Sequence, residues 1–146
     1  MNWLDMILDL IMGQRGRVIP KEMPSITSTE VGAMLKAYTP NVWLSDGIFQ
    51  LVDTENLKAF LASDPISGRA YVSEKHDCDD YSYELMGHVS DWNPDNTFGI
   101  VWGLNSGGGA HAWNFFVNEN IEVKYVEPQT DSIFDPSNEK IWLMIV

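Results

Sequence analysis

The sequence has little of what marks several large classes of protein. It contains one cysteine in 146 residues, so an internal disulfide is impossible and small disulfide-stapled secreted proteins are excluded. It has only 9 basic residues against 21 acidic ones, which gives a formal net charge of -12. This charge predicts that the protein binds no nucleic acid and no anionic membrane surface, because clustered Lys and Arg bind such partners.

Long hydrophobic runs are also missing. No stretch of 18 uninterrupted apolar residues occurs, so no membrane span is expected. Asp5 and Asp9 interrupt the apolar start of the chain, and neither a preceding basic residue nor a cleavage site of small residues is present. We therefore expect no signal peptide and a cytoplasmic protein.

Residues 1–20 are predicted to carry an amphipathic helix instead. Its apolar face would hold Trp3, Leu4, Ile7, Leu8 and Ile11. Such a face either docks on its own domain or serves for self-association.

The residues that are present predict a single α+β domain over residues 1–146. Hydrophobic residues make up 45% of the chain, which is enough for one core at this length. Helices are expected over 27–38, over 54–62 and from 77 onward. Strands rich in β-branched and aromatic residues are expected over 98–102, 110–117, 121–126 and 140–146. Helices come first and an antiparallel sheet follows.

Most of the negative charge lies in the second half of the chain, around the cysteine. Residues 74–140 hold thirteen acidic and three basic side chains. Asp77 is a good N-cap and Asp80 stands at the capping-box position, so Cys78 is predicted to be the first helical residue. Because the N-terminus of a helix favours negative charge, Cys78 is a candidate nucleophile.

A nucleophilic thiol needs a base, and the chain has three histidines. His88 would lie about 15 Å along the same helix from Cys78, too far for a hydrogen bond. His76 precedes the cap, and its direction cannot be read from the sequence. His111, in a predicted strand, is the remaining candidate.

The neighbour of His111 follows from the expected hairpin. If residues 118–120 form its loop, Val117 pairs with Ile121 and His111 stands opposite Glu127, whose carboxylate can orient the imidazole. A two-residue loop would place Pro128 opposite His111 instead.

Four short motifs then resemble a known family. They are Asp77-Cys78-Asp79-Asp80-Tyr81, Phe98-Gly99-Ile100-Val101-Trp102-Gly103, His111-Ala112-Trp113-Asn114 and Val126-Glu127-Pro128-Gln129. Over about residues 40–146 the chain resembles the papain-like, calcium-dependent cysteine protease domain at the C-terminus of the fairy-ring mushroom agglutinin and in small bacterial and phage relatives.

The resemblance implies a papain-like protease fold and a cytoplasmic or phage-associated protein. Its triad would be Cys78 as nucleophile, His111 as base and Glu127 as orienting carboxylate. The agglutinin also carries a sugar-binding trefoil, but the segment before residue 40 is too short for one, so no lectin domain is expected.

A calcium site is predicted partly from the charges around Cys78. Asp77, Asp79 and Asp80 crowd Cys78 and disfavour its thiolate, so an activated thiol would need a compensating cation. Asp79 and Asp80 offer the hard oxygen ligands that Ca²⁺ prefers, although acids in a first helical turn are also ordinary caps.

The expected function is that of an enzyme, a cysteine peptidase-like hydrolase acting on a peptide or protein. Tyr71 and Gln129 are candidate oxyanion or substrate donors beside the Cys78 N–H. The same triad would also suit a peptidoglycan amidase or a transglutaminase-type acyltransferase. Two alternatives come from other classes of protein. One is a catalytically silent phage or bacterial interaction module, and the other is a zinc site that uses His76 and Cys78.

Overall fold

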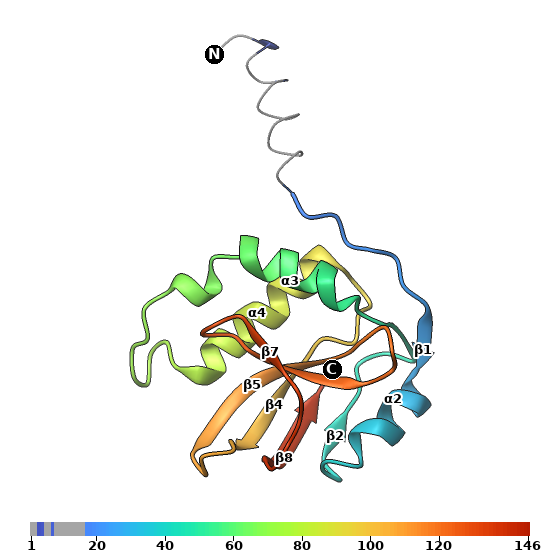
Figure 1. Cartoon of the computed structure of the whole chain (residues 1–146), viewed down its shortest axis with the longest axis vertical. Coiled ribbons are helices and arrows are strands. Elements are labelled where there is room, and N and C mark those ends of the chain that lie inside the picture. Colours follow the sequence, from blue (N-terminus) through green and yellow to red (C-terminus); the bar gives the residue numbers. More distant parts are fainter. Residues whose placement is uncertain (1–2, 5–6, 8–16) are drawn as a thin grey trace.

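A computed structural model describes residues 3–4, 7 and 17–146 of the chain (Figure 1). Trp3, Leu4 and Ile7 are helical and exposed, whereas residues 17–20 are not helical. The other residues of the helix predicted over residues 1–20 lie outside the described part of the chain. Within the described part, no helix combines the length and the apolar character that crossing a membrane requires.

The helices form where the sequence predicts them. The bounds are α2 at Ser28–Leu35, α3 at Thr54–Ser63, α4 at Cys78–Trp92 and a short 3-10 helix, η1, at Ile66–Gly68. Thr27 and Glu30 form the predicted capping box of α2, and Asp53 caps α3 by accepting from the Asn56 N–H at 2.9 Å. The three predicted helices are therefore confirmed.

The strands form two sheets. The bounds are β1 at Ser25–Thr27, β2 at Val42–Trp43, β3 at Ile48–Gln50, β4 at Gly99–Leu104, β5 at Ala110–Val117, β6 at Val123–Glu127, β7 at Ser132–Phe134 and β8 at Lys140–Ile145. β1 pairs with β3, and the other six strands follow the order β2-β8-β4-β5-β6-β7.

The prediction of a purely antiparallel sheet placed after the helices is wrong. β2 pairs in parallel with β8, and three short strands precede α3. These strands have two or three residues each, too few for a period of two to stand out in the sequence.

Helices cover both faces of the large sheet (Figure 1). α3 and α4 share one hydrophobic core with Phe116 and Val126, whereas α2 shares the other with Trp113 and Phe115. Neighbouring residues of β5 point into opposite cores because strand side chains alternate between faces. The N-terminus of α4 thereby lies against β5, with Asn114 bonded to Ser82.

The hairpin between β5 and β6 differs from its expected register. Val117 pairs with Val123 rather than with Ile121, so the connection covers residues 118–122 instead of 118–120. The Asn118 side chain accepts hydrogen bonds from the N–H groups of Asn120 and Glu122, and Ile121 has a positive φ of 59°. Because the register moves by two residues, every β6 side chain keeps its expected face.

Candidate functional site

Cys78 begins α4, as predicted, and its thiol reaches the neighbouring sheet. The carboxylate of Asp80 accepts a hydrogen bond from the N–H of Asp77 at 3.1 Å, which closes the first turn of the helix. The N–H of Ala112 on β5 lies close enough to the half-buried thiol of Cys78 to lower its pKa. Cys78 is thus held beside the residue that follows His111.

Asn114 ties α4 to the sheet. Its buried side-chain amide donates to the carbonyl oxygens of Ser82 on α4 and Gly99 on β4, both at 3.0 Å. The Ser82 hydroxyl in turn donates to the carbonyl of Cys78 at 2.8 Å. The sequence analysis missed Asn114, although a lone amide within the apolar run of β5 signals a buried hydrogen-bonding role.

His111 and Glu127 form the predicted pair. Nε2 of His111 lies 2.6 Å from Oε2 of Glu127, and both side chains are mostly buried. The other oxygen of Glu127 accepts from the Gln129 N–H at 3.2 Å, and the His111 ring stacks on Trp113 with centroids 5.8 Å apart. Contacts on both sides therefore fix the imidazole in one orientation.

The pair opens onto a cavity of about 270 Å³. Its lining includes His111, Trp113 and Glu127, together with Phe134, Glu139 and the loop at residues 105–107. Among the described residues, no hydrogen bond joins the Cys78 thiol to the His111 ring. With Nε2 bonded to Glu127, Nδ1 is the nitrogen left for another partner.

The environment of Cys78 favours the neutral thiol. Burial raises the pKa of Cys78, and the negative charges of Asp77 and Asp79 raise it further. The backbone N–H groups of Ala112 and Asp79 lower this pKa, but by less. The expectation that the helix N-terminus lowers this pKa is wrong for the chain on its own, because burial and the acidic neighbours outweigh the helix.

Two of the neighbouring acids form a pair. A hydrogen bond between the carboxyl groups lowers the pKa of Asp77 and raises that of Asp79. Ligand atoms of Asp77, Cys78 and Asp79 lie within 4.8 Å of one another. The Asp80 carboxylate faces the Asp77 N–H instead. The structure thus brings together Asp77 and Asp79, a pair that the sequence analysis did not single out.

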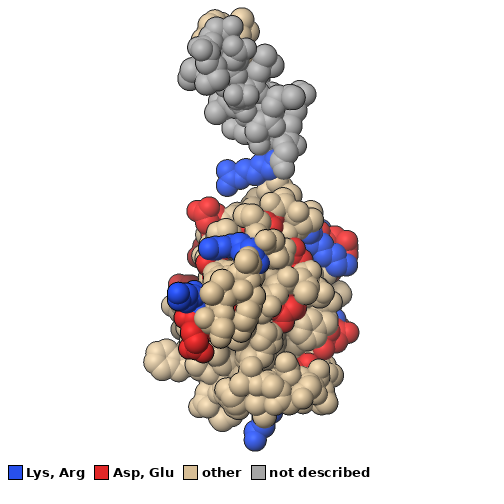
Figure 2. Space-filling model, turned by 90° about the vertical axis from the view of Figure 1, so that its left-hand side faces the viewer, with Lys and Arg blue, Asp and Glu red and all other residues tan. Residues whose placement is uncertain are grey.

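The local acidity does not extend into one continuous acidic face. On the side of the molecule shown in Figure 2, acidic and basic side chains are interspersed among uncharged ones.

The two predicted donors lie in loops. Tyr71 is 57% exposed and close enough to Asp77 and Cys78 for their charges to raise its pKa, after a larger contribution from burial. Gln129 lies in the turn that follows β6, where its backbone, rather than its amide, contacts Glu127. Their roles as oxyanion or substrate donors stay predictions.

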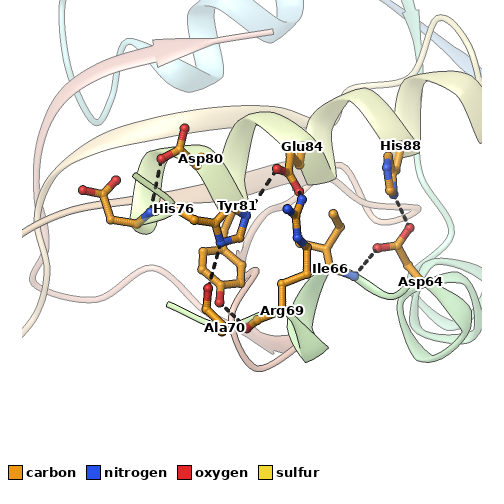
Figure 3. A network of polar contacts seen from close by, with 10 residues as sticks. Asp64, Ile66, Arg69, Ala70, His76, Asp80, Tyr81, Glu84 and His88 are labelled. Carbon is orange, nitrogen blue, oxygen red and sulfur yellow. Dashed lines mark hydrogen bonds and ion pairs between the residues drawn. The ribbon is translucent and has the colours of Figure 1, made fainter. Parts of the chain in front are cut away.

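The other two histidines are engaged elsewhere (Figure 3). Nδ1 of His88 lies 2.6 Å from Asp64, and Nε2 of His76 lies 3.2 Å from Glu84. Neither contact includes Cys78, so neither histidine is placed to act on the thiol.

A comparison with protein families decides the classification. The family model described as the ricin-type beta-trefoil lectin C-terminal domain matches residues 26–145. The chain belongs to this lectin C-terminal domain family.

Two solved structures share the fold of this family member. PSL1a in complex with E64 has a TM-score of 0.73 and 25% sequence identity, and the match covers 84% of this chain and 51% of that one. The Polyporus squamosus lectin bound to Neu5Aca2-6Galb1-4GlcNAc has a TM-score of 0.69 and 26% identity, with 84% and 49% covered. The chain spans about half the length of each. No curated protein matches it.

These matches correct the family and fold inferred from the motif resemblance. The family and the solved neighbours are those of lectins, so the expected papain-like protease family and fold give way to the lectin C-terminal domain and its fold. The expectation of no lectin domain is wrong for the same reason. Short motifs around a cysteine and a histidine describe a local arrangement, which different families can share.

The expected activity is corrected as well. The family and the solved neighbours are those of lectins and do not support a hydrolase, an amidase or a transglutaminase. The peptide or protein substrate came from the same resemblance and is withdrawn with it, whereas the phage or bacterial setting stays a prediction.

Proposed function

We propose that this chain serves as a domain of a carbohydrate-binding protein and contributes a ligand site centred on Cys78. One observation carries the proposal. The Ala112 N–H lies close enough to the thiol to lower its pKa, and the next residue toward the start of β5 is His111, whose ring is fixed by Glu127 at 2.6 Å. A thiol next to the strand that carries an oriented imidazole and lines a cavity is suited to hold a ligand that reacts with or hydrogen-bonds to sulfur.

The comparison with PSL1a supports this site. PSL1a forms a complex with E64, and its fold matches 84% of this chain. We propose that E64 binds here at Cys78, with His111 and Glu127 lining one side of the occupied cavity.

A calcium ion belongs to the same proposal. The donor set suits Ca²⁺ because Asp77 and Asp79 offer adjacent carboxylates that now share a hydrogen bond. The bound ion would supply positive charge next to the thiol. Asp79 is retained from the predicted ligands, and Asp77 is added because its carboxylate lies near the carboxylate of Asp79 and the thiol of Cys78. Asp80 stays a predicted ligand, with one oxygen bonded to the Asp77 N–H.

Intact-mass measurement after incubation with E64 tests the site. The native chain is expected to gain the mass of one ligand, and Cys78→Ala none, because the chain has a single cysteine. His111→Ala is expected to slow the reaction on the order of tenfold by removing the oriented imidazole. His88→Ala, which changes a histidine on the same helix away from the thiol, should react at the native rate. An unmodified native chain, or a modified Cys78→Ala chain, would contradict the proposal.

Glycan binding by this chain itself is a second candidate. The Polyporus squamosus lectin is bound to a glycan, and the large sheet of this chain exposes two tryptophans, Trp43 on β2 (70%) and Trp142 on the adjacent strand β8 (45%). Aromatic rings of this kind offer an apolar face together with a polar N–H group.

Titration of the chain with Neu5Aca2-6Galb1-4GlcNAc, followed by tryptophan fluorescence, tests this candidate. Trp43→Ala or Trp142→Ala is expected to weaken binding on the order of tenfold, which corresponds to about 1.4 kcal/mol. Trp3→Ala, outside the sheet, serves as the control. No saturable change in the native chain would exclude glycan binding by this domain.

A further inference from the structure

A small hairpin precedes Cys78 and leads into its helix. The N–H of Val72 donates to the carbonyl of His76 at 2.9 Å, and the N–H of His76 donates back to Val72 at 2.7 Å. Continuing this antiparallel register places Tyr71 opposite Asp77, the residue before Cys78. We call residues 69–77 the Tyr71 hairpin.

Both ends of the Tyr71 hairpin are attached to one face of α4 (Figure 3). At the first end, Arg69 forms an ion pair with Glu84, and the Tyr81 hydroxyl donates to the Arg69 carbonyl. At the second end, Nε2 of His76 lies 3.2 Å from the other oxygen of Glu84. The His76 ring also packs on Tyr81 with centroids 4.3 Å apart, and its Nδ1 lies 3.2 Å from the carbonyl of Ala70.

Glu84 is the one charged side chain among these contacts that reaches both ends, and the uncharged Tyr81 also contacts both, through its hydroxyl to Arg69 and its ring against His76. The two carboxylate oxygens of Glu84 face Arg69 and His76, which are separated by the whole hairpin. The His76 side chain is 12% exposed, and its Nε2 is buried with no aligned hydrogen-bond partner among the described residues. Removing the Glu84 carboxylate would leave this buried nitrogen with no acidic group beside it and would free Arg69.

The Tyr71 hairpin lies next to the thiol, because Asp77 at its end directly precedes Cys78. Tyr71 lies near Asp77 and Cys78, whose charges affect its hydroxyl, and its ring is largely exposed toward solvent. The position of that ring depends on the hairpin, since Tyr71 lies between the two ends that Glu84 holds.

We propose that Glu84 is a positioning residue that fixes the Tyr71 hairpin beside Cys78 and so controls which ligands reach the thiol. The inference rests on the proposed ligand site. With the hairpin fixed, an extended ligand has a wall to lie against. With the hairpin loose, the thiol is more open to small reagents but binds an extended ligand less well.

Two labelling rates measured on Glu84→Ala test this role. Iodoacetamide labelling of Cys78 is expected to rise about threefold, because local opening exposes the thiol. E64 labelling is expected to fall about tenfold, because the wall for the ligand is lost. Glu84→Gln keeps the length and polar end of the side chain and should restore most of both rates. Glu55→Ala, which removes a glutamate from an exposed ion pair on α3, should change neither rate. Rates that match the native protein, or that both change in the same direction, would overturn the proposal.

Amide hydrogen exchange gives an independent readout. The N–H groups of Val72 and His76 are expected to exchange faster in Glu84→Ala, with α2 and the central sheet unaffected. Unchanged protection of these two amides would overturn the role of Glu84. A native chain that takes up no E64 would contradict the ligand site, whereas the exchange rates would still decide whether Glu84 holds the hairpin.

Discussion

Calcium is expected to raise the rate of Cys78 alkylation at pH 7 on the order of tenfold, which corresponds to a fall of about one unit in the thiol pKa. Burial and the charges of Asp77 and Asp79 raise this pKa in the chain alone. A cation between the two carboxylates cancels the contribution of their negative charges to the thiol pKa. The thiolate is the reacting species, so a lower pKa enlarges its fraction below the midpoint and moves the pH profile toward lower pH.

Variants of the acidic pair give this prediction its control. The double variant Asp77→Asn and Asp79→Asn should lose the response to calcium, while its thiol pKa without calcium should lie below that of the native protein. Asp91→Asn, at the other end of α4, should respond as the native chain does. The rate of iodoacetamide labelling, measured with calcium and with a chelator from roughly pH 6 to 10, the range around a thiol pKa, would show these differences. If the native chain gave the same pH profile with calcium as with the chelator, this result would contradict a cation site beside the thiol.

Gly99→Ala is expected to destabilise the domain by at least about 3 kcal/mol, because an overpacked core must shift its backbone. A Cβ at Gly99 would lie 2.2 Å from the carbonyl oxygen of Ile145 and 2.6 Å from the Phe115 ring. The substitution also disturbs the carbonyl that accepts from Asn114, which links α4 to β5. Thermal unfolding should show a fall in Tm of about 6 to 12 °C.

Gly87→Ala is the matched substitution for this measurement. Gly87 lies within α4, and an added Cβ there would meet no atom within 4 Å. Alanine is the better helix former, so we expect a gain of about 0.5 to 1 kcal/mol. Equal Tm values for Gly99→Ala and the native chain would show that β4 and β8 do not approach as closely as described.

Much of the site could be predicted because local signals determine it. The capping residues Asp77 and Asp80 place Cys78 at the start of α4, and strand alternation places His111 and Glu127 on one face. The loop at Asn118 is longer than expected, yet the even shift in register kept that face. The acidic neighbours were expected to raise the thiol pKa, but the larger contribution from burial could not be predicted, because it depends on tertiary packing.

The rest of the architecture depends on contacts that a single sequence does not reveal. β2 has two residues and pairs in parallel with β8, about one hundred positions later in the chain. In the sequence Asn114 is one residue of an apolar strand, and its role becomes clear only from its hydrogen bonds to Ser82 and Gly99 in the structure. Classification failed for a related reason, because Cys78, His111 and Glu127 describe a local arrangement and the lectin C-terminal domain family is identified over residues 26–145.

A crystal structure of the chain grown with E64 tests the central claim most directly. We expect the ligand at the Sγ atom of Cys78, extending toward the cavity that His111 and Glu127 line. A ligand bound elsewhere, with the Cys78 thiol unmodified beside the Ala112 N–H, would contradict a site centred on this cysteine.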